Sequence, residues 1–227
     1  MIDFDNIFEN CQMPVNCILS KQEKALFIQS ISIVEFNKKE TIIKQGSKSN
    51  NIIYLQHGLV KISRELRKDK HIIIKLDNDG KFAGLVSLFD SNSINFTVTA
   101  IEQSKVVFIN IDTFIQVMES NARFATETAK LISYNTIFNI NRITGLLHKQ
   151  LPGRVADLIL YFSEQLFNAP QFRIPLTRLE LAELCGTTKE SLIRTLSEFK
   201  HDKIIEMDKK FIKVISYDIL KTLSRLG

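Results

Sequence analysis

The sequence is poor in the residues that mark several classes of protein. It has three cysteines among 227 residues, four prolines, eight glycines and no tryptophan. So few cysteines argue against a disulfide framework and indicate a reducing compartment. The first ten residues lack a basic segment followed by an apolar core, so we expect no signal peptide. No apolar run approaches the roughly 20 residues that cross a bilayer. We therefore expect a cytoplasmic protein with no membrane partner.

Catalytic motifs and a strong charge of one sign are missing as well. The chain has no phosphate-binding glycine loop, no metal-ligand spacing and no nucleophile elbow, so we expect that it is not an enzyme. The net charge is only +5, and residues 150–227 contain 12 basic and 10 acidic residues. Any affinity for nucleic acid must therefore come from a local arrangement of charges on one face.

What the first half does contain is a series of short β-branched and aromatic runs. Between about Ile31 and Ile111 these are ISIVEF, TIIK, NIIYL, LVKIS, HIIIKL, FTVTAI and KVVFINI, separated by turn residues. Strands this close together leave no room for crossover helices, so the pattern predicts an antiparallel sandwich or roll. Together with the helices around it, the chain is expected to be of the α+β class.

Helical segments flank these strands. Residues 3–30 are expected to be mainly helical, with Ser20 and Glu23 forming a capping box. Asp112 is expected to cap a helix over 113–119, and a further helix is expected over 154–167. Between them, residues 121–150 contain no proline and predict one long helix capped by Asn121.

That long helix is apolar on more than one side, so it must be buried on two sides. One side can cover the strands, and the other can lie along the same helix of a second copy. The candidate dimerisation residues are Leu131, Ile132, Asn135, Phe138 and Ile143. The register stays open because two series of positions keep the spacing, and a central core helix of a monomer is the alternative.

Residues 176–203 predict two short amphipathic helices around a tight turn. Leu179, Leu181, Ala182 and Leu184 are expected to be the apolar positions of the first helix, and Leu192, Ile193, Leu196 and Phe199 those of the second. Gly186 can adopt the positive φ of a sharp turn. Thr188 can cap the second helix. The strand-like runs IIEMD and KFIKVIS follow, joined by Asp208-Lys209-Lys210, and residues 217–226 predict a short final helix or a tail.

The order of roll, long helix and winged helix-turn-helix resembles the Crp/Fnr family of bacterial transcription regulators. In the first half the resemblance rests on KQGSKSNNIIYLQHGLVKIS and GKFAG, and in the second on LTRLELAELCGTTKESLIRTLSEFK. It implies a sensor domain over 1–120, a dimerisation helix with hinge over 121–151 and a DNA-binding domain over 152–227. It also implies a homodimer that binds an inverted repeat in double-stranded DNA, with RNA polymerase as a partner if the protein activates.

The resemblance assigns roles within the second half. Glu190 and Arg194 would read base pairs, with Lys189 beside them as a point donor. Thr177, Arg178, Thr188 and Ser191 would hold phosphates. The full set of candidate DNA-binding residues is Thr177, Arg178, Thr187, Thr188, Lys189, Glu190, Ser191 and Arg194.

The first half departs from the cyclic-AMP receptors of the family. Those receptors have a glutamate after the turn glycine and an Arg-Ser pair about ten residues later, whereas this chain has Leu85 and Ile94-Asn95-Phe96. Without a cation for the phosphate, cyclic AMP is not expected to bind in the familiar mode. An apolar segment comprising Phe82, Gly84, Leu85, Leu88 and Phe96 could enclose an uncharged ligand or form packed core.

Other cofactors of the family find little support. An iron–sulfur cluster held by four thiolates cannot form from Cys11, Cys17 and Cys185, which is expected to be a buried packing residue. Cys11 and Cys17 could form a reversible disulfide or contribute to a metal site, and the alternative is that their spacing is incidental. Haem stays open, although His57, His71, His148 and His201 show no metal-ligand spacing, so the cofactor and the signal are unknown.

The main alternative function is a ligand-binding or protein-interaction module whose helix-turn-helix does not bind DNA. The small excess of basic residues in the second half is the observation in its favour.

Overall fold

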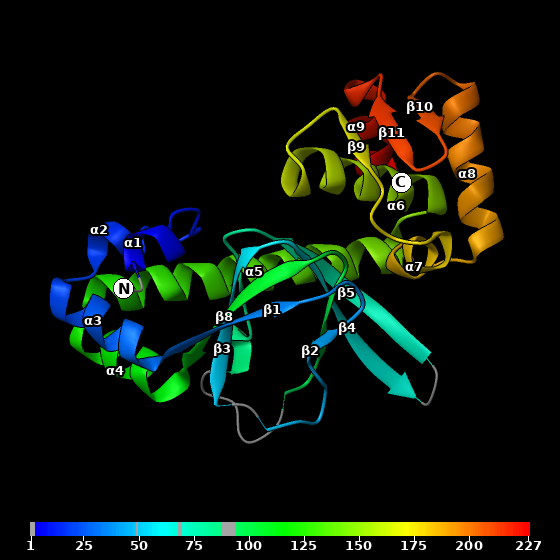
Figure 1. The fold of residues 1–227 in the computed structure, drawn as a ribbon. Coiled ribbons are helices and arrows are strands. Elements are labelled where there is room, and N and C mark those ends of the chain that lie inside the picture. The colour runs from blue at the N-terminus through cyan, green and yellow to red at the C-terminus, as the bar shows by residue number, and fades with distance from the viewer. Residues whose placement is uncertain (1–2, 49, 68–69, 88–93) are drawn as a thin grey trace. The chain divides into compact units, whose positions relative to one another are not determined.

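The computed structural model describes residues 3–48, 50–67, 70–87 and 94–227. The chain divides into two compact units, Met1–Ile137 and Phe138–Gly227. Their boundary falls inside one long helix, α5 (Ala122–His148). The division into 1–120, 121–151 and 152–227 stays a prediction about function. The α+β class is confirmed: strands dominate the N-terminal unit, and the C-terminal unit combines helices with a small sheet (Figure 1).

The N-terminal unit contains two four-stranded antiparallel sheets, as the spacing of the strands predicts. The first has the order β1 (Ile31–Phe36), β8 (Ser104–Asn110), β3 (Asn51–His57) and β6 (Phe82–Ala83). The second has the order β2 (Thr41–Ile43), β7 (Thr97–Ala100), β4 (Leu59–Arg67) and β5 (Lys70–Asn78). The short strand β6 lies within the GKFAG segment and was not expected from the pattern.

The two faces of the first sheet bury different clusters, because successive side chains in a strand point to opposite faces. In β3, Ile52 and Tyr54 join the helices of the unit in one apolar cluster. Ile53 and Leu55 instead join residues of the second sheet in another. The near-continuous apolar run of this strand is therefore explained by burial on both faces.

Helices α1 (Phe4–Ile7), α2 (Val15–Ile18) and α3 (Lys21–Ser30) precede the strands, and α4 (Ile111–Ser120) follows them. The predicted capping box of α3 is confirmed, since the hydroxyl of Ser20 accepts from the Glu23 amide and the Glu23 carboxylate accepts from the Ser20 amide. The predicted cap of α4 is wrong. Asn110 caps this helix by accepting from the Thr113 amide at 3.1 Å, and Asp112 lies in its first turn.

Asn121 caps the long helix α5, as predicted, with its side-chain oxygen 3.0 Å from the Phe124 amide. The first half of α5 covers the strands of its own unit: Phe124 is 1% exposed and Thr128 is fully buried. Leu131 and Ile132 also pack against the cluster that contains Ile52 and Tyr54. One side of the helix is therefore buried within its own chain.

The C-terminal unit begins within α5 and continues with α6 (Leu151–Leu160), a π-helix (Tyr161–Leu166), β9 (Gln171–Arg173), α7 (Arg178–Leu184), α8 (Lys189–His201), β10 (Ile205–Asp208), β11 (Phe211–Val214) and α9 (Tyr217–Leu226). The chain bends at Lys149–Gln150, and Pro152 lies in the first turn of α6, where its missing amide is harmless. The helix expected over 154–167 starts earlier and ends as a π-helix, with the Phe167 amide donating to the Phe162 carbonyl.

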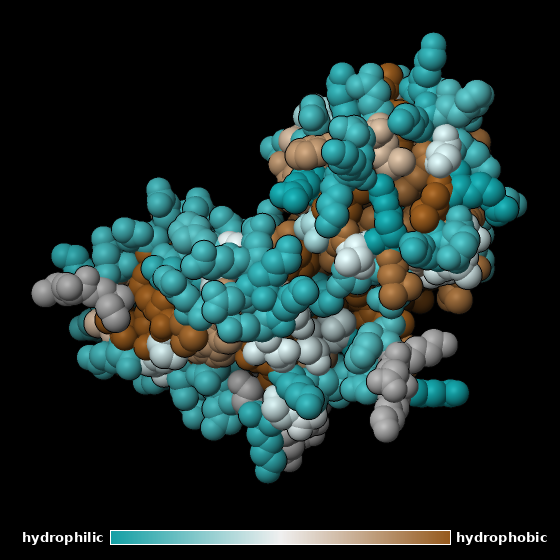
Figure 2. All heavy atoms as spheres, turned by 45° about the vertical axis from the view of Figure 1, so that its right-hand side comes forward, coloured by the Kyte–Doolittle hydropathy of each residue, from teal (hydrophilic) through white to brown (hydrophobic). Residues whose placement is uncertain are grey.

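A three-stranded antiparallel sheet of order β10-β11-β9 completes this unit. The predicted hairpin β10–β11 and the predicted helix α9 are confirmed. Strand β9 is the third strand and pairs with β11. Among the described residues, no helix is both long and apolar enough to cross a membrane. The face in Figure 2 is mostly hydrophilic, with hydrophobic areas on each unit.

Candidate nucleic-acid interface

Helix α7 begins with a second capping box that the sequence analysis did not identify. The Thr177 hydroxyl accepts from the Glu180 amide at 3.2 Å, and the Glu180 carboxylate accepts from the Thr177 amide at 2.9 Å. Leu181, Ala182 and Leu184 are buried as expected. Leu179, which was expected to pack inside, is 59% exposed.

The turn after α7 has the predicted geometry. Gly186 adopts a φ of +60°, in the left-handed region that favours glycine. Cys185 is 2% exposed, as expected for a packing residue. Burial raises the pKa of its thiol to about 12, so the side chain is uncharged. The Thr187 amide donates to the Ala182 carbonyl at 2.9 Å, which closes the turn.

Helix α8 begins at the predicted cap. The Thr188 hydroxyl accepts from the Ser191 amide, and Leu192, Leu196 and Phe199 bury one face of the helix. Ile193 was also expected to face the core but is 40% exposed. The reason in both helices is geometric: positions 179 and 193 lie on the solvent side, and periodicity alone could not exclude them from a wide apolar stripe.

The predicted base-reading residues share the exposed side of α8. Glu190 and Arg194 are exposed and lie four positions apart, so their side chains lie on one face of the helix. Lys189 is exposed at the first position of the same helix. A carboxylate and a guanidinium placed in this way can accept from a cytosine amino group and donate to a guanine.

The hydroxyls proposed to hold phosphates already take part in capping. The Thr177 hydroxyl also donates to the Glu180 carboxylate at 2.9 Å, and the Thr188 hydroxyl donates to that of Ser191 at 3.1 Å. With the proton of Thr188 committed in this way, Ser191 keeps its own hydroxyl proton. Ser191 is therefore the best placed of the three hydroxyls to donate to a phosphate.

Arg178 has a partner that the sequence did not reveal. Its Nη2 atom donates to the Lys209 carbonyl at 2.8 Å and lies 3.4 Å from the Met207 sulfur. Burial lowers the pKa of the guanidinium. The side chain predicted to contact a phosphate thus ties α7 to the β10–β11 hairpin.

That hairpin adds candidate contacts that sequence reasoning missed. Lys209 and Lys210 are exposed in its turn, where Lys209 adopts a φ of +50°. Two adjacent lysines in a turn between strands are suited to a phosphate backbone. The Asp-Lys-Lys sequence between the two strand-like runs was the signal that could have identified them.

Two arginines outside the helix pair hold the turn between α7 and α8. Arg142, on α5, donates to the Leu184 carbonyl at 2.8 Å, and Arg154, on α6, donates to the Gly186 carbonyl at 2.9 Å. The last carbonyls of a helix lack partners within the helix, and cations stabilise them. We refer to these two side chains as the turn arginines. Nothing in the local sequence predicts them, because the bonded residues are 42 and 32 positions apart.

Four of the five candidate dimerisation residues have neighbours within their own chain. Leu131 and Ile132 pack against the core, and Asn135 accepts from Lys75 at 3.0 Å. The Phe138 ring lies 5.4 Å from that of Tyr161. Ile143 is 57% exposed. Other exposed apolar residues of α5 are Tyr134, Ile137, Ile140 and Leu147, which sequence spacing did not single out.

The candidate effector residues lie mainly in packed core. Phe82 and Leu85 are 3% exposed in the cluster under the helices, and Phe96 is 7% exposed in the cluster between the sheets. Gly84 has a φ of +94°. Leu88 lies outside the described residues.

The histidines and cysteines considered for metals or redox chemistry form neither a metal cluster nor a disulfide in the described part of the chain. Within the described part of the chain, no group of three or more His, Cys, Asp or Glu side chains could hold a metal ion. Cys11, Cys17 and Cys185 are all free thiols. Cys17 is exposed, whereas burial raises the pKa of Cys11 to about 12.

Comparison with known families gives two matches along the chain. Residues 33–121 match the cyclic nucleotide-binding domain family, and residues 153–223 match the Crp-like helix-turn-helix domain family. One match lies within each compact unit.

Curated relatives match over most of their length. The chain is 21% identical over 205 residues to the CRP-like cAMP-activated global transcriptional regulator of Mycobacterium tuberculosis, covering 88% of this chain and 92% of the relative. It is 23% identical over 192 residues to the cAMP-activated global transcriptional regulator CRP of Salmonella typhimurium, covering 83% and 91%.

Solved structures share the fold. FixK2 from Bradyrhizobium japonicum superposes with a TM-score of 0.78 at 18% identity, covering 85% of this chain and 96% of FixK2. The c-di-GMP responsive global regulator CLP of Xanthomonas campestris gives a TM-score of 0.73 at 17% identity, covering 87% and 100%.

Proposed function

Because the chain belongs to the Crp/Fnr family of transcription regulators and carries a helix-turn-helix DNA-binding domain, we propose that it acts as a homodimer that reads an inverted repeat in double-stranded DNA. Glu190 and Arg194 read base edges, and Lys189 adds a softer contact. Ser191, Lys209 and Lys210 contact phosphates, which set the register but do not read sequence.

The observation that carries this proposal is the exposed pair Glu190 and Arg194 on a helix that is fixed from below. Thr188 caps α8, Leu192 and Leu196 bury its opposite face, and Gly186 shapes the turn before it. A reading helix has to present its side chains in a fixed geometry, because hydrogen bonds to base edges tolerate little displacement. The local structure supports such a role.

The dimer contact is proposed along α5. Tyr134, Ile137, Ile140, Ile143 and Leu147 are each at least 55% exposed on this helix. Ile137, Ile140 and Leu147 follow each other at steps of three and seven, the spacing of a helix seam. We place the contact on these residues, since Leu131, Ile132, Asn135 and Phe138 already have partners within the chain.

The signal is proposed to act on the N-terminal unit and is not cyclic AMP in the familiar mode. Leu85 is buried in the core, and the sequence from Gly84 to Ala100 contains no lysine or arginine. A buried phosphate without a cationic partner is strongly disfavoured. If the protein activates transcription, RNA polymerase is a further partner. The proposed location is the cytoplasm, where a bacterial regulator meets its DNA.

The readout is tested with DNA fragments selected from random sequence by the full-length protein, followed by footprinting and shift assays. Glu190→Ala and Arg194→Ala should each lower affinity for the selected site roughly tenfold to a hundredfold and leave non-specific affinity nearly unchanged, because a good base contact contributes about 1–3 kcal/mol.

Lys200→Ala is the matched control, since Lys200 is exposed at the opposite end of α8. Selected binding that survives both Glu190→Ala and Arg194→Ala would overturn the assigned readout. A complete lack of salt-dependent DNA affinity would instead favour the protein-interaction alternative.

The dimer is tested by sedimentation. Ile137→Asp with Ile140→Asp should convert the dimer to a monomer and abolish binding to the inverted repeat, because a buried unpaired charge is costly. Leu26→Asp, at an apolar α3 position that is 37% exposed, is the control. An unchanged dimer in the double variant would contradict this contact.

A further inference from the structure

One apolar side chain interrupts the polar surface of the helix proposed to read DNA. Among the residues of α8, all of which the structure describes, Ile193 is the only large hydrophobic residue that is exposed, at 40%. The other apolar side chains of this helix, Leu192, Leu196 and Phe199, are at most 4% exposed. Ile193 therefore lies at the surface, although its chemistry is that of a core residue.

Ile193 lies beside the residues to which base reading is assigned. It follows Lys189 by four positions and Glu190 by three, and residues at these spacings are neighbours on a helix surface. Arg194 is the next residue along the chain. One turn further on, Ser197 donates its hydroxyl proton to the Ile193 carbonyl at 2.9 Å, so this donor is committed to the helix itself. The surface around Ile193 thus combines charged groups with one branched apolar side chain.

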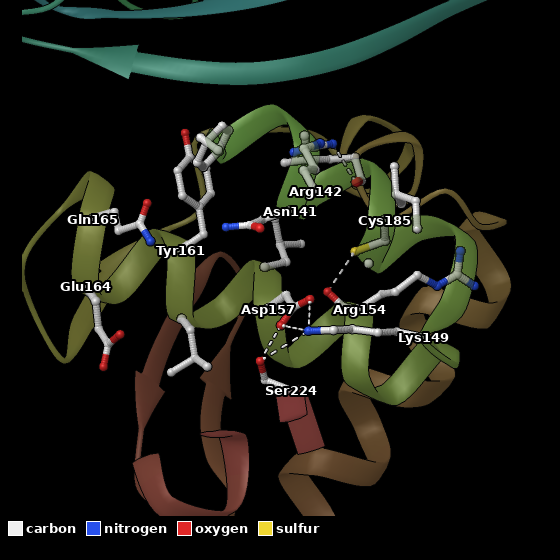
Figure 3. A pocket seen from close by; sticks show the side chains of 16 residues that line it. Asn141, Arg142, Lys149, Arg154, Asp157, Tyr161, Glu164, Gln165, Cys185 and Ser224 are labelled. Carbon is white, nitrogen blue, oxygen red and sulfur yellow. Dashed lines mark hydrogen bonds and ion pairs between the residues drawn. The ribbon is translucent and has the colours of Figure 1, made fainter. Parts of the chain in front are cut away.

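The backbone that carries Ile193 is held in place at the turn before α8. The turn arginines, Arg142 and Arg154, donate to the main-chain carbonyls on either side of Cys185, at 2.8 and 2.9 Å. Figure 3 shows both arginines with Cys185, whose thiol donates to the Arg154 carbonyl at 3.9 Å. A side chain that branches at Cβ also has one strongly preferred χ1 rotamer in a helix. Ile193 therefore presents its methyl groups with little side-chain freedom to lose on binding.

An isoleucine at this position is unfavourable unless a partner covers it. Isoleucine is a poorer helix former than alanine or lysine, and its exposed apolar surface stays in water. The base edges in the major groove present hydrogen-bond donors and acceptors, and their only apolar group is the C5-methyl of thymine. A side chain that neither donates nor accepts can therefore distinguish base pairs there only by this methyl group.

We propose that Ile193 is a further specificity-determining residue of α8 and packs on the C5-methyl group of a thymine in each half-site. This inference rests on the proposed function and deepens it, because it names a base that the helix prefers beside the pairs read by Glu190 and Arg194. Burying one methyl group contributes about fourfold in affinity for each half-site.

The test starts from the site that the full-length protein selects from random DNA. Each thymine is replaced in turn by uracil, in both half-sites at once, which removes the C5-methyl group and keeps every hydrogen-bonding group of the base. At one position the affinity should fall roughly tenfold to twentyfold, because two methyl contacts are lost. This measurement uses the unaltered protein, so it does not depend on the stability of a variant.

Two substitutions assign the methyl contact to Ile193. Ile193→Ala should abolish the preference for thymine over uracil at that position and keep the discrimination due to Glu190 and Arg194. Ile193→Val, which keeps a branched apolar side chain, should retain most of the preference. Ile219→Ala is the matched control, since Ile219 is an isoleucine of α9 that is 44% exposed. Circular dichroism confirms that each variant is folded.

The outcomes separate this inference from the proposed function. A selected site that depends on Glu190 and Arg194 but is indifferent to every thymine methyl would overturn the contact of Ile193 and leave the readout intact. A uracil effect that persists in folded Ile193→Ala would assign the methyl to another residue. Equal losses for that variant on thymine and uracil sites would reduce Ile193 to a structural role. If the protein selects no site, the proposed function and this inference fail together.

Discussion

The N-terminal and C-terminal units each match a family but differ in the side chains at their candidate sites. On α8, the helix proposed to read DNA, the charged residues Glu190 and Arg194 are exposed. In the roll, Leu85 and Phe96 are buried in apolar clusters where a cyclic nucleotide would need charged partners. A shared fold therefore transmits a function only where the side chains that perform its chemistry are also present.

The largest expected effect concerns thiol reactivity, which should separate the exposed Cys17 from the buried cysteine of each unit. Burial raises the pKa of both Cys11 and Cys185 to about 12, whereas Cys17 is exposed. Only the thiolate is nucleophilic, so at pH 8 iodoacetamide should modify Cys11 and Cys185 at least roughly a thousandfold more slowly than Cys17.

Mass spectrometry of the native protein over time measures the three rates, and the protein unfolded in guanidinium supplies the control in which all three thiols react. Rapid labelling of Cys185 would show that the turn between α7 and α8 opens readily. Rapid labelling of Cys11, or a disulfide between Cys11 and Cys17, would favour a redox role for the N-terminal unit.

A pair of glycine substitutions compares the turns of the two units. Gly186 and Gly46 both have positive φ, at +60° and +82°. A Cβ at Gly186 would lie 3.0 Å from Leu146 Cδ2 and 3.3 Å from Arg154 Nη1, whereas at Gly46 it would meet no atom within 4 Å. Gly46→Ala should therefore cost about 1 kcal/mol from backbone strain, and Gly186→Ala about 2–3 kcal/mol.

Urea unfolding followed by fluorescence and circular dichroism measures both free energies. Gly186→Ala should in addition weaken DNA binding, and Gly46→Ala should not. Equal losses for the two variants would mean that the close approach of Leu146 and Arg154 to the turn contributes nothing.

A smaller effect is expected for Arg178→Ala, which separates a structural from a phosphate-binding role. Losing the charged hydrogen bond to the Lys209 carbonyl should lower the free energy of unfolding by about 1–2 kcal/mol. DNA affinity should fall similarly on all sequences, with an unchanged slope against salt. If instead the slope falls by about one unit while stability is retained, Arg178 contacts a phosphate directly.

The smallest effect is predicted for cyclic AMP, which should leave the melting temperature of the protein unchanged at millimolar concentration. The Salmonella typhimurium relative, which is described as cAMP-activated, is the positive control. A saturable rise in the melting temperature of this chain would show that the roll binds cyclic AMP through other residues. The N-terminal unit would then not differ from the C-terminal unit in keeping its family's ligand.

Features that depend on neighbouring residues were predictable from the sequence. The caps at Ser20, Asn121 and Thr188 and the positive φ of Gly186 follow from side chains within a turn of the backbone they serve. The alternation of strands and turns also predicted the antiparallel roll, since period and spacing are properties of short segments.

Features that depend on distant partners were not predictable. Leu179 and Ile193 are apolar but exposed, because an apolar side chain does not specify the partner that would cover it. The π-helix after Leu160 and the bonds of the turn arginines depend on tertiary packing. The proposed dimer face was not predictable either. Residue spacing could not show which side of α5 packs against the rest of its own chain.

The turn arginines bind main-chain oxygens, and this choice of partner bears on how the protein can evolve. Every residue type carries a carbonyl, so Arg142 and Arg154 can hold positions 184 and 186 regardless of the side chains that follow on α8. Under the proposed readout, substitutions at Lys189, Glu190 and Arg194 can therefore alter the preferred DNA site without removing the hydrogen bonds that hold the turn. The exposed residues of α8 can therefore change during evolution while the turn arginines keep the same hydrogen bonds.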